Sequence, residues 1–307
     1  MELIRTLHPA TSCRGFSALT IGNFDGLHRG HQALVKAVLD HAPELQPALM
    51  CFEPLPATLF RPDQPVARLM GVRDRVSVCR RLGLKQLYML RFDRAFAALS
   101  PDDFVRLALL GAARTRQVVV GADFRFGARA AGDADLLAKM GQRHGFGVQV
   151  IEPVCAAEQK ISSSRIRALL AAGELDAAGA LLGRHYALAG RVLRGQQLGR
   201  QLGFPTVNLR PPTPPALTGV FAVRVSGPGL DRHPGVANLG KRPTVAGSDW
   251  LLEAHLFDYR GELYGRHLKV EFAHFLRAEE KFPSLDAMAA QMRGDAARAR
   301  RLLTETG

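Results

Sequence analysis

The order of the sequence patterns changes near Gly183, and this change constrains the fold more than any other feature of the 307-residue chain. Before it, short apolar runs alternate with segments that carry apolar residues at i, i+3 and i+4. After it, strand-like runs follow one another with only turn residues between them. Alternating strands and helices predict a parallel sheet covered on both faces, whereas consecutive strands predict an antiparallel sheet. A chain of this length has room for two such domains.

The first region predicts a Rossmann-like α/β domain over residues 1–184. Its expected strands are the apolar runs Ala18–Ile21, Pro47–Phe52, Gln86–Leu90, Gln117–Val120 and Gly147–Ile151. Its expected helices include His31–Leu39, Asp74–Leu82 and Pro101–Leu110. We expect these elements to form a parallel sheet with helices on both faces.

The second region, residues 185–307, predicts a small antiparallel β-barrel or sandwich with a C-terminal helix. Its expected strands are Ala187–Val192, Gly219–Val225, Gly235–Asn238, Leu251–Phe257 and His267–Phe275. Ser284 is expected to open the helix, which carries an apolar stripe formed by Leu285, Met288, Ala289, Met292 and Ala296.

Composition and charge narrow the classes of function. With 47% hydrophobic and 22% charged residues, the chain is neither a disordered tail, nor a collagen-like repeat, nor a disulfide scaffold. The net charge of +13 is spread evenly, with 24 basic and 17 acidic residues up to position 184 and 17 and 11 after it. A basic surface favours anionic partners, and nucleotides, nucleic acid and acidic membranes all remain open on charge alone.

The cysteines and the apolar runs predict the compartment. Cys13, Cys51, Cys79 and Cys155 form no C-x-x-C pair and sit beside no histidine at metal-ligand spacing. We expect buried thiols in a reducing cytoplasm. The longest apolar runs are far shorter than the ~20 residues that span a bilayer, so a soluble protein is expected.

The segment Gly22–His31 carries the densest chemistry of the first region. It follows an apolar strand and opens a helix, which places it at the carboxyl edge of the sheet, where such folds bind ligands. Its glycines let the backbone approach an anion, the helix N-terminus attracts one, and His28 and His31 can donate to phosphate oxygens. A phosphate site is therefore predicted. The alternatives are a surface turn with solvated histidines, or a zinc pair that lacks a third ligand.

This pattern, G-x-F-D-G-x-H-x-G-H, resembles the nucleotidylyltransferase superfamily and, with F-D-G before the histidines, is similar to bacterial FAD synthetases. The resemblance implies that the two histidines grip the phosphates of ATP during catalysis. It implies an ATP site formed by the whole turn: Gly22, Phe24, Asp25, Gly26, His28 and His31.

A second segment, Ile161–Arg167, holds three serines and two arginines at the start of a helix. Hydroxyl donors and permanent cations suit a triphosphate, although serine at a helix start usually only caps it. The segment is similar to a family motif, I-S-S-S/T-x-I-R. The resemblance implies that Ser163, Ser164 and Arg167 bind ATP, with Arg167 also acting in catalysis.

Two loops at strand ends are candidates for binding ring systems. The loop Gly121–Gly127 carries an acid and two aromatics between glycines, so it can hold a flat ring or fold on itself. It is similar to a family loop, G-x-D/N-F-x-F-G, which implies ATP at Asp123 and flavin at Phe126. The run from Phe52 to Pro56 resembles a family F-x-P-x-P segment, which implies that both residues contact the flavin.

In the second region, the run Gly203–Asn208 reads G-F-P-T-V-N. Spacing alone favours a Gly-Pro turn between two strands, but the run resembles the G-F-P-T-x-N signature of riboflavin kinases. The resemblance implies that Gly203 lies at ATP and that oxygens of Thr206 and Asn208 hold Mg²⁺ with it. Hard oxygen ligands suit that ion.

Glu253 lies in a segment that matches a riboflavin kinase strand with one catalytic glutamate. A strand glutamate is normally solvated, but a kinase that phosphorylates an alcohol needs a carboxylate to take the hydroxyl proton. The resemblance implies this role, next to the flavin, for Glu253. The segment Leu276–Phe282 is also similar to this family, which implies a flavin contact for Arg277.

The resemblance covers nearly the whole chain and identifies it as a member of the bacterial bifunctional riboflavin kinase and FMN adenylyltransferase family. It implies that the barrel converts riboflavin and ATP to FMN, and that the first domain converts FMN and ATP to FAD. Mg²⁺ is the expected cofactor, and the expected partners are small molecules, with neither nucleic acid nor membrane. The alternatives are an OB-like nucleic-acid binder, which shows no stacking platform, and another adenylyltransferase with a regulatory barrel.

Overall fold

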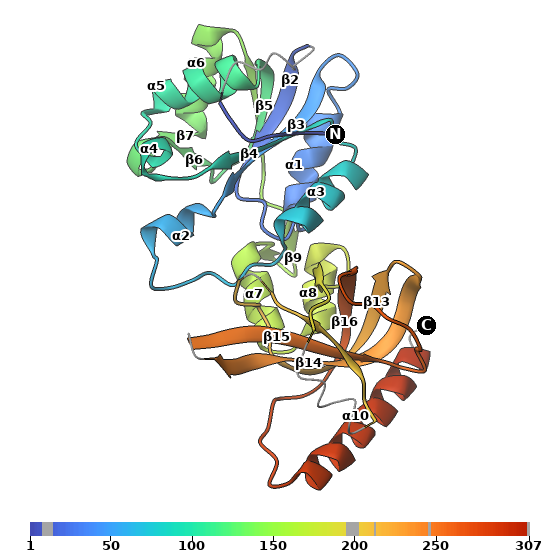
Figure 1. Ribbon diagram of the computed structural model, residues 1–307. Helices are drawn as coiled ribbons and strands as arrows, with labels where there is room; N and C mark the ends of the chain where they lie inside the picture. Colours follow the sequence, from blue (N-terminus) through green and yellow to red (C-terminus); the bar gives the residue numbers. More distant parts are fainter. Residues whose placement is uncertain (8–14, 195–202, 212, 245–246, 306–307) are drawn as a thin grey trace. The chain divides into compact units, whose positions relative to one another are not determined.

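The computed structural model describes residues 1–7, 15–194, 203–211, 213–244 and 247–305 (Figure 1). Contacts between Cα atoms divide the chain into two units. The first comprises Met1–Val66 and Val72–Ser162, and the second comprises Ala67–Gly71 and Ser163–Gly307. Cys13 and the residues 199–202 that precede the G-F-P-T run lie outside the described residues.

The first unit is built on a six-stranded parallel sheet in the order β1-β4-β3-β2-β5-β8. The strands are β1 (Glu2–Ile4), β2 (Ser17–Ile21), β3 (Gln46–Glu53), β4 (Gln86–Arg91), β5 (Thr115–Gly121) and β8 (Gly147–Ile151). All five predicted strands are present, which confirms the predicted α/β sheet. Strand β1 was not predicted, because it has only three residues, and it pairs with β4 at the sheet edge.

Helices cover both faces of this sheet, because its strands carry apolar residues on both sides. Leu19 and Ile21 of β2 belong to the core cluster that also includes residues of α5, η1 and α6, whereas α1 packs on the other face (Figure 1). The helices are α1 (Arg29–Leu39), α2 (Pro56–Phe60), α3 (Val72–Arg81), α4 (Arg94–Ala97), α5 (Pro101–Phe104), η1 (Val105–Ala112) and α6 (Ala134–His144). Two short hairpins complete the unit, β6–β7 (Arg125–Phe126 and Gly132–Asp133) and β9–β10 (Cys155–Ala156 and Gln159–Lys160).

The helix predicted over Pro101–Leu110 is present, but its second half is not α-helical. Ser100 caps its start, accepting from the backbone N–H of Asp103 at 3.1 Å. From Val105 onward the helix widens to π-helical geometry, and the N–H of Ala113 donates to Ala108 O, five residues back. A 3.6-residue periodicity over so short a segment does not reveal this change of winding.

The second unit is built on a six-stranded antiparallel sheet in the order β11-β16-β13-β14-β15-β12. The strands are β11 (Ala187–Arg191), β12 (Thr206–Leu209), β13 (Gly219–Gly227), β14 (Leu230–Thr244), β15 (Gly247–Leu256) and β16 (His267–Arg277). The sheet curls until the chain beyond one edge strand meets the other, where Leu193 N–H donates to Asn208 O at 2.8 Å. The prediction of a small antiparallel barrel followed by a helix is confirmed.

One expectation for this sheet was wrong. The G-F-P-T run was placed in a turn between strands, but its last two motif residues, Thr206 and Asn208, lie in strand β12. Gly203 and Pro205 favour a turn, and the strand that follows them is only four residues long. These four residues form a strand because they pair with β15, about fifty residues later in the sequence. The local pattern does not show this pairing.

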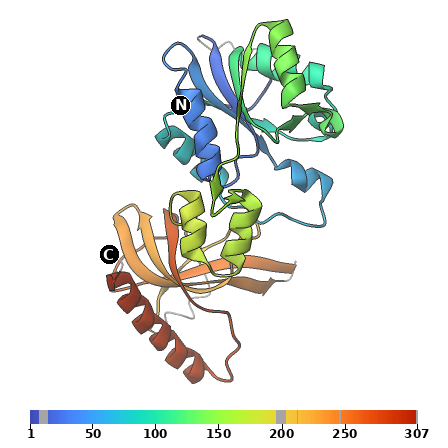
Figure 2. The same cartoon turned by 180° about the vertical axis from the view of Figure 1, so that it is seen from behind.

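Helices lie on both sides of this sheet: α7 (Ser163–Ala171) and α8 (Leu175–Leu182) on one, and α10 (Leu285–Glu305) on the other (Figure 2). Ala296, Ala299 and Leu303 of α10 pack against Val220 and Ala222 of β13.

The predicted stripe on α10 is correct in its middle and wrong at its start. Ala289 and Ala296 are buried, but Leu285 is 66% exposed. Leu285 is the first residue of the helix, and the buried stripe continues toward Ala299 and Leu303 at the other end instead.

The cysteines also depart from expectation at one position. Cys51 and Cys79 are buried thiols that are not part of a disulfide, as predicted, whereas Cys155 is exposed because it lies in the short surface hairpin β9–β10. Across the described ranges of the chain, no helix combines the length and apolar character needed to cross a bilayer.

Candidate active sites

The strand order of the first unit reverses between β2 and β5. From β2 the chain proceeds to β3 and β4 on one side, and β5 and β8 lie on the other. Such a reversal leaves a crevice at the carboxyl ends of the two central strands. The turn Gly22–His28 follows β2, and the loop that begins at Gly121 follows β5. Two of the segments selected from the sequence therefore lie at one ligand-binding edge.

The turn after β2 has a backbone shape that few sequences adopt. Phe24 (φ 48°) and Leu27 (φ 42°) lie in the left-handed region, as does Gly26 (φ 86°). Left-handed backbone is strained for bulky residues and persists only where the surroundings fix it. Here both side chains are fully buried, and Asp25 between them is 1% exposed. The turn is therefore preformed, as a phosphate site at a helix N-terminus requires.

His28 and His31 are held together at the start of α1. Their rings stack with centroids 3.6 Å apart, and the ring of Phe24 meets His31 edge-on at 5.0 Å. His28 caps the helix, because its Nδ1 accepts from the N–H of His31 at 3.3 Å. A Cβ on Gly30 would lie 3.2 Å from His28 Nδ1, so the glycine between the histidines leaves room for that ring. Because Nδ1 accepts, the neutral ring carries its proton on Nε2, which is then a donor.

The surroundings of His31 keep its imidazole neutral. Burial lowers its pKa well below the ordinary value of 6.5, and the neighbouring His28, Arg75 and Lys160 lower it further. Lys160 is paired with Asp123, Nζ to Oδ2 at 2.5 Å, and this hydrogen bond lowers the pKa of Asp123. Three cationic or polar groups thus surround one histidine, an arrangement that suits an anionic ligand.

The depressed pKa of His31 predicts how stability depends on pH. Below about pH 6.5 the His31 side chain binds a proton in the unfolded chain but not in the folded chain. The free energy of unfolding therefore falls as the pH drops below that value. Thermal unfolding of His31→Gln, measured between about pH 7 and about pH 5, should show a shallower decline in Tm than the wild type. An unchanged slope would contradict a buried neutral His31.

Arg75 is a neighbour of this site that was not predicted from the sequence. It is fully buried on α3, with Nη1 3.5 Å from Cys51 Sγ and 3.6 Å from a carboxylate oxygen of Glu53. A signal was present, because Arg75 shares the buried face of its helix with Val78 and Cys79. A cation on an apolar face marks either a buried ion pair or a site.

Ser163, Ser164 and Arg167 lie on the first turns of α7, which groups with the second unit rather than with the histidine turn. Arg167 Nε donates to Ala67 O at 2.6 Å. Their predicted role at ATP rests on sequence and stays a prediction.

The flavin contacts predicted in the first unit also stay predictions. Phe52 at the end of β3 is buried and packs against Phe92 and Phe96 at centroid distances of 5.6 and 5.3 Å. Phe126 is 6% exposed, and Pro56 begins helix α2.

The second unit brings its predicted catalytic residues onto one face of its sheet. Asn208 of β12 lies directly opposite Glu253 of β15, and Glu253 lies directly opposite Asn238 of β14. Opposed residues of antiparallel strands project to the same face. Thr206, two residues before Asn208 and opposite His255, shares that face. Strand pairing therefore joins Thr206, Asn208 and Glu253, which are far apart in the sequence.

The residues predicted to hold Mg²⁺ have suitable chemistry. Asn208 is 7% exposed, and its Oδ1 has no hydrogen-bond partner among the described residues. A buried carbonyl oxygen without a donor is suited to a cation, and the Thr206 hydroxyl is a second hard ligand on the same face. Gly203, exposed with φ 80° and open space where a Cβ would be, turns the chain into this strand.

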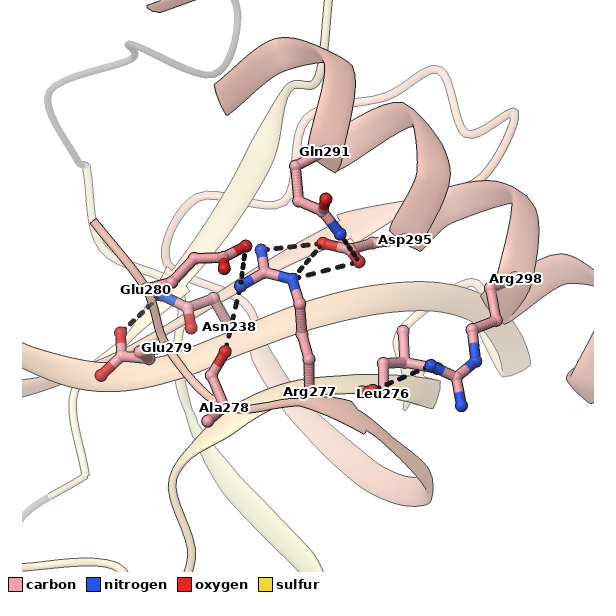
Figure 3. A network of polar contacts seen from close by, with 9 residues as sticks. All are labelled: Asn238, Leu276, Arg277, Ala278, Glu279, Glu280, Gln291, Asp295 and Arg298. Carbon is pink, nitrogen blue, oxygen red and sulfur yellow. Dashed lines mark hydrogen bonds and ion pairs between the residues drawn. The ribbon is translucent and has the colours of Figure 1, made fainter. Parts of the chain in front are cut away.

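Arg277 makes several contacts with protein groups (Figure 3). Its guanidinium bonds both carboxylate oxygens of Asp295 on α10, at 3.0 and 3.2 Å from Nε, and pairs with Glu280 at 3.2 Å. Gln291 donates to the same Asp295. The flavin contact predicted for Arg277 remains a prediction.

Two family models match the chain, one to each region. A model of FAD synthetase matches residues 11–165, and a model of riboflavin kinase matches residues 182–303. A solved structure from Streptococcus pneumoniae, described as a macrolide-efflux protein, superposes with a TM-score of 0.83 at 28% identity, covering 97% of this chain and 98% of that one.

Full-length relatives agree with both family models. The chain is 42% identical to the bifunctional riboflavin kinase/FMN adenylyltransferase of Escherichia coli, over 98% of this chain and 97% of the relative. It is 40% identical to the protein of that description from Haemophilus influenzae, over 96% and 97%. The chain therefore belongs to the family of bifunctional riboflavin kinase/FMN adenylyltransferases.

Proposed function

We propose that the chain makes FAD from riboflavin in two ATP-dependent steps, one in each region. The second region transfers the terminal phosphate of ATP to riboflavin, giving FMN and ADP. The first transfers AMP from a second ATP to the phosphate of FMN, giving FAD and pyrophosphate. The observation that carries this proposal is the pairing of Glu253 with Asn208 across neighbouring strands. It brings the proposed general base next to a proposed ligand of the Mg²⁺ that binds the ATP phosphates.

In the kinase step, the nucleophile is the terminal hydroxyl of the ribityl chain. It is a neutral alcohol, so a base must remove its proton as the oxygen attacks the terminal phosphorus of ATP. We assign this role to Glu253, and its pairing with Asn208 across β12 and β15 supports the assignment. Thr206 and Asn208 are the residues that would hold Mg²⁺, which when bound neutralises charge on the ATP phosphates.

The adenylylation step needs no base, because the FMN phosphate is already an anion. Its oxygen attacks the α-phosphorus of ATP, the bond to the β-phosphate oxygen breaks, and pyrophosphate leaves. Catalysis then reduces to positioning and to donors for the charged oxygens. His28 and His31 supply those donors from a preformed turn, and we assign Asp123 of the same unit to this ATP. The ATP role of Ser163, Ser164 and Arg167 is proposed from their sequence motif alone.

We place the protein in the cytoplasm. The buried thiols of Cys51 and Cys79 are not joined in disulfides, which supports a reducing compartment. The assay that tests the whole proposal is incubation with riboflavin, ATP and Mg²⁺, followed by separation of the flavins. FMN should appear first and FAD after it. Riboflavin that remains unchanged would exclude the kinase, and accumulation of FMN alone would exclude the adenylyltransferase.

Fragments test the boundary between the regions, which we propose at 184/185. Residues 185–307 contain the sheet with Thr206, Asn208 and Glu253, so this fragment should phosphorylate riboflavin. A longer fragment, 163–307, retains α8, whose Leu175, Leu181 and other apolar residues are buried. We expect the longer fragment to unfold about 5 °C or more above the shorter one. Equal Tm values would show that α7 and α8 add nothing to this domain, and an inactive, folded short fragment would refute the boundary.

A further inference from the structure

Asn238 occupies a special position in the kinase region. Along one rung of the sheet, Asn208, Glu253 and Asn238 follow one another on β12, β15 and β14. We propose that Asn238 binds the polyol substrate, with its Oδ1 accepting a hydrogen bond from a hydroxyl next to the one that Glu253 deprotonates. This inference rests on the proposed kinase function and deepens it.

The amide of Asn238 has a defined orientation (Figure 3). Its Nδ2 donates to Glu279 Oε1 at 3.0 Å. An ionised carboxylate only accepts hydrogen bonds, so the amide nitrogen must face Glu279 and the amide oxygen must face the other way. That oxygen is buried and has no donor among the residues that the structure describes. It is an acceptor in place for a ligand hydroxyl.

The rung also indicates which ligand reaches this oxygen. Glu253 has one asparagine on each side. On the Asn208 side lie the two proposed metal ligands, Asn208 itself and Thr206. In phosphoryl transfer, the donor phosphate and the acceptor alcohol approach each other in line. If ATP lies on the Asn208 side of the base, the alcohol lies on the Asn238 side. Riboflavin brings several neighbouring hydroxyls there, and each is a donor.

The surroundings of Glu279 maintain this arrangement. Gly240 is two residues beyond Asn238 on the same face of β14, and a Cβ there would collide with the Glu279 carboxylate. A glycine is therefore needed for Glu279 to reach Asn238. The segment that carries Glu279 is anchored just before it, because Arg277 is ion-paired with Asp295 on α10 and with Glu280 (Figure 3).

The principal test is Asn238→Ala in the full-length protein. The KM for riboflavin should rise about 10-fold, the usual effect of losing one hydrogen bond to a buried acceptor, while the KM for ATP stays unchanged. A riboflavin analogue that keeps the terminal hydroxyl but lacks the inner ones completes a thermodynamic cycle, in which one change is made in the protein and the other in the substrate. The analogue should have a raised KM with the wild type and about the same KM as riboflavin with the variant.

Variants that retain Asn238 test whether Glu279 and Gly240 fix the orientation of its amide. Glu279→Ala and Gly240→Ala should each raise the KM for riboflavin, because the first removes the carboxylate that orients the amide and the second displaces it. Glu279→Gln retains an acceptor and should restore most of the affinity. Glu271→Ala is the matched control, since Glu271 on β16 pairs with Arg232 and Lys269 instead.

The outcomes separate this inference from the function on which it rests. No FMN from the wild type would overturn the kinase proposal itself. An active wild type with an unchanged riboflavin KM in Asn238→Ala would overturn the role of Asn238 alone. A raised KM for ATP in that variant would place Asn238 at the nucleotide and would also overturn the inference.

Discussion

Replacement of Glu253 by glutamine is expected to lower the rate of riboflavin phosphorylation by roughly 10²–10⁴-fold, the usual contribution of a positioned general base. Glutamine keeps the shape and a hydrogen-bonding oxygen but cannot take the proton of the ribityl hydroxyl. Riboflavin affinity should therefore change little. Adenylylation of supplied FMN should be unaffected, because that nucleophile arrives already ionised.

Two initial rates on one preparation measure this, riboflavin to FMN and FMN to FAD. Glu271→Gln serves as the control, because Glu271 is a glutamate of the same sheet that pairs with Lys269 and Arg232. A near-normal kinase rate in Glu253→Gln would leave Glu253 as an ordinary strand residue. Loss of both rates would indicate misfolding or one shared site, and either result would contradict the mechanism.

The double change of His28 and His31 to alanine should abolish FAD formation while FMN formation continues. Losing one preorganised donor to a transition-state oxygen costs about 10²–10³-fold in rate, and this variant loses two. It also loses the helix cap that His28 supplies. FMN should therefore accumulate from riboflavin, and supplied FMN should remain unchanged.

Controls for the histidine variant separate chemistry from folding. His28→Asn restores a capping side chain without an imidazole, so with His31→Ala it should be more stable than the double alanine variant and still inactive. His144→Ala, an exposed histidine at the end of α6, should retain full activity. Loss of FMN formation in a folded double variant would refute the assignment of separate sites.

The sequence predicted the fold well where each element carries its own signal. The five strands of the parallel sheet that were predicted have five to eight residues each, and the curled antiparallel sheet follows from consecutive strands with turns between them. The elements that were missed have weak local signals. Strand β12 has four residues after a glycine and a proline, and β1 has three.

The candidate sites also differ in how local their sequence signals are. The His28–His31 turn could be recognised because all its parts are contiguous in the sequence. Glu253 and Asn238 are fifteen positions apart, and only the register of β14 and β15 places them opposite each other. A local pattern does not show which strands pair or which segment folds back onto a strand, so the Glu253–Asn238 pairing and the Asn238–Glu279 contact had to come from the structure. The buried Arg75 was visible only as a cation on an apolar helix face.

The central claim is that one chain holds two separate catalytic sites that share FMN as product and substrate. A mixture of two variants tests it most directly. Glu253→Gln and the His28→Ala, His31→Ala double variant are combined in equal amounts with riboflavin, ATP and Mg²⁺, and FAD is measured. Neither variant alone should make FAD at an appreciable rate, whereas the mixture should, because FMN released by the second variant is adenylylated by the first. A mixture that forms FMN but no FAD, although the Glu253→Gln variant converts supplied FMN, would contradict the account.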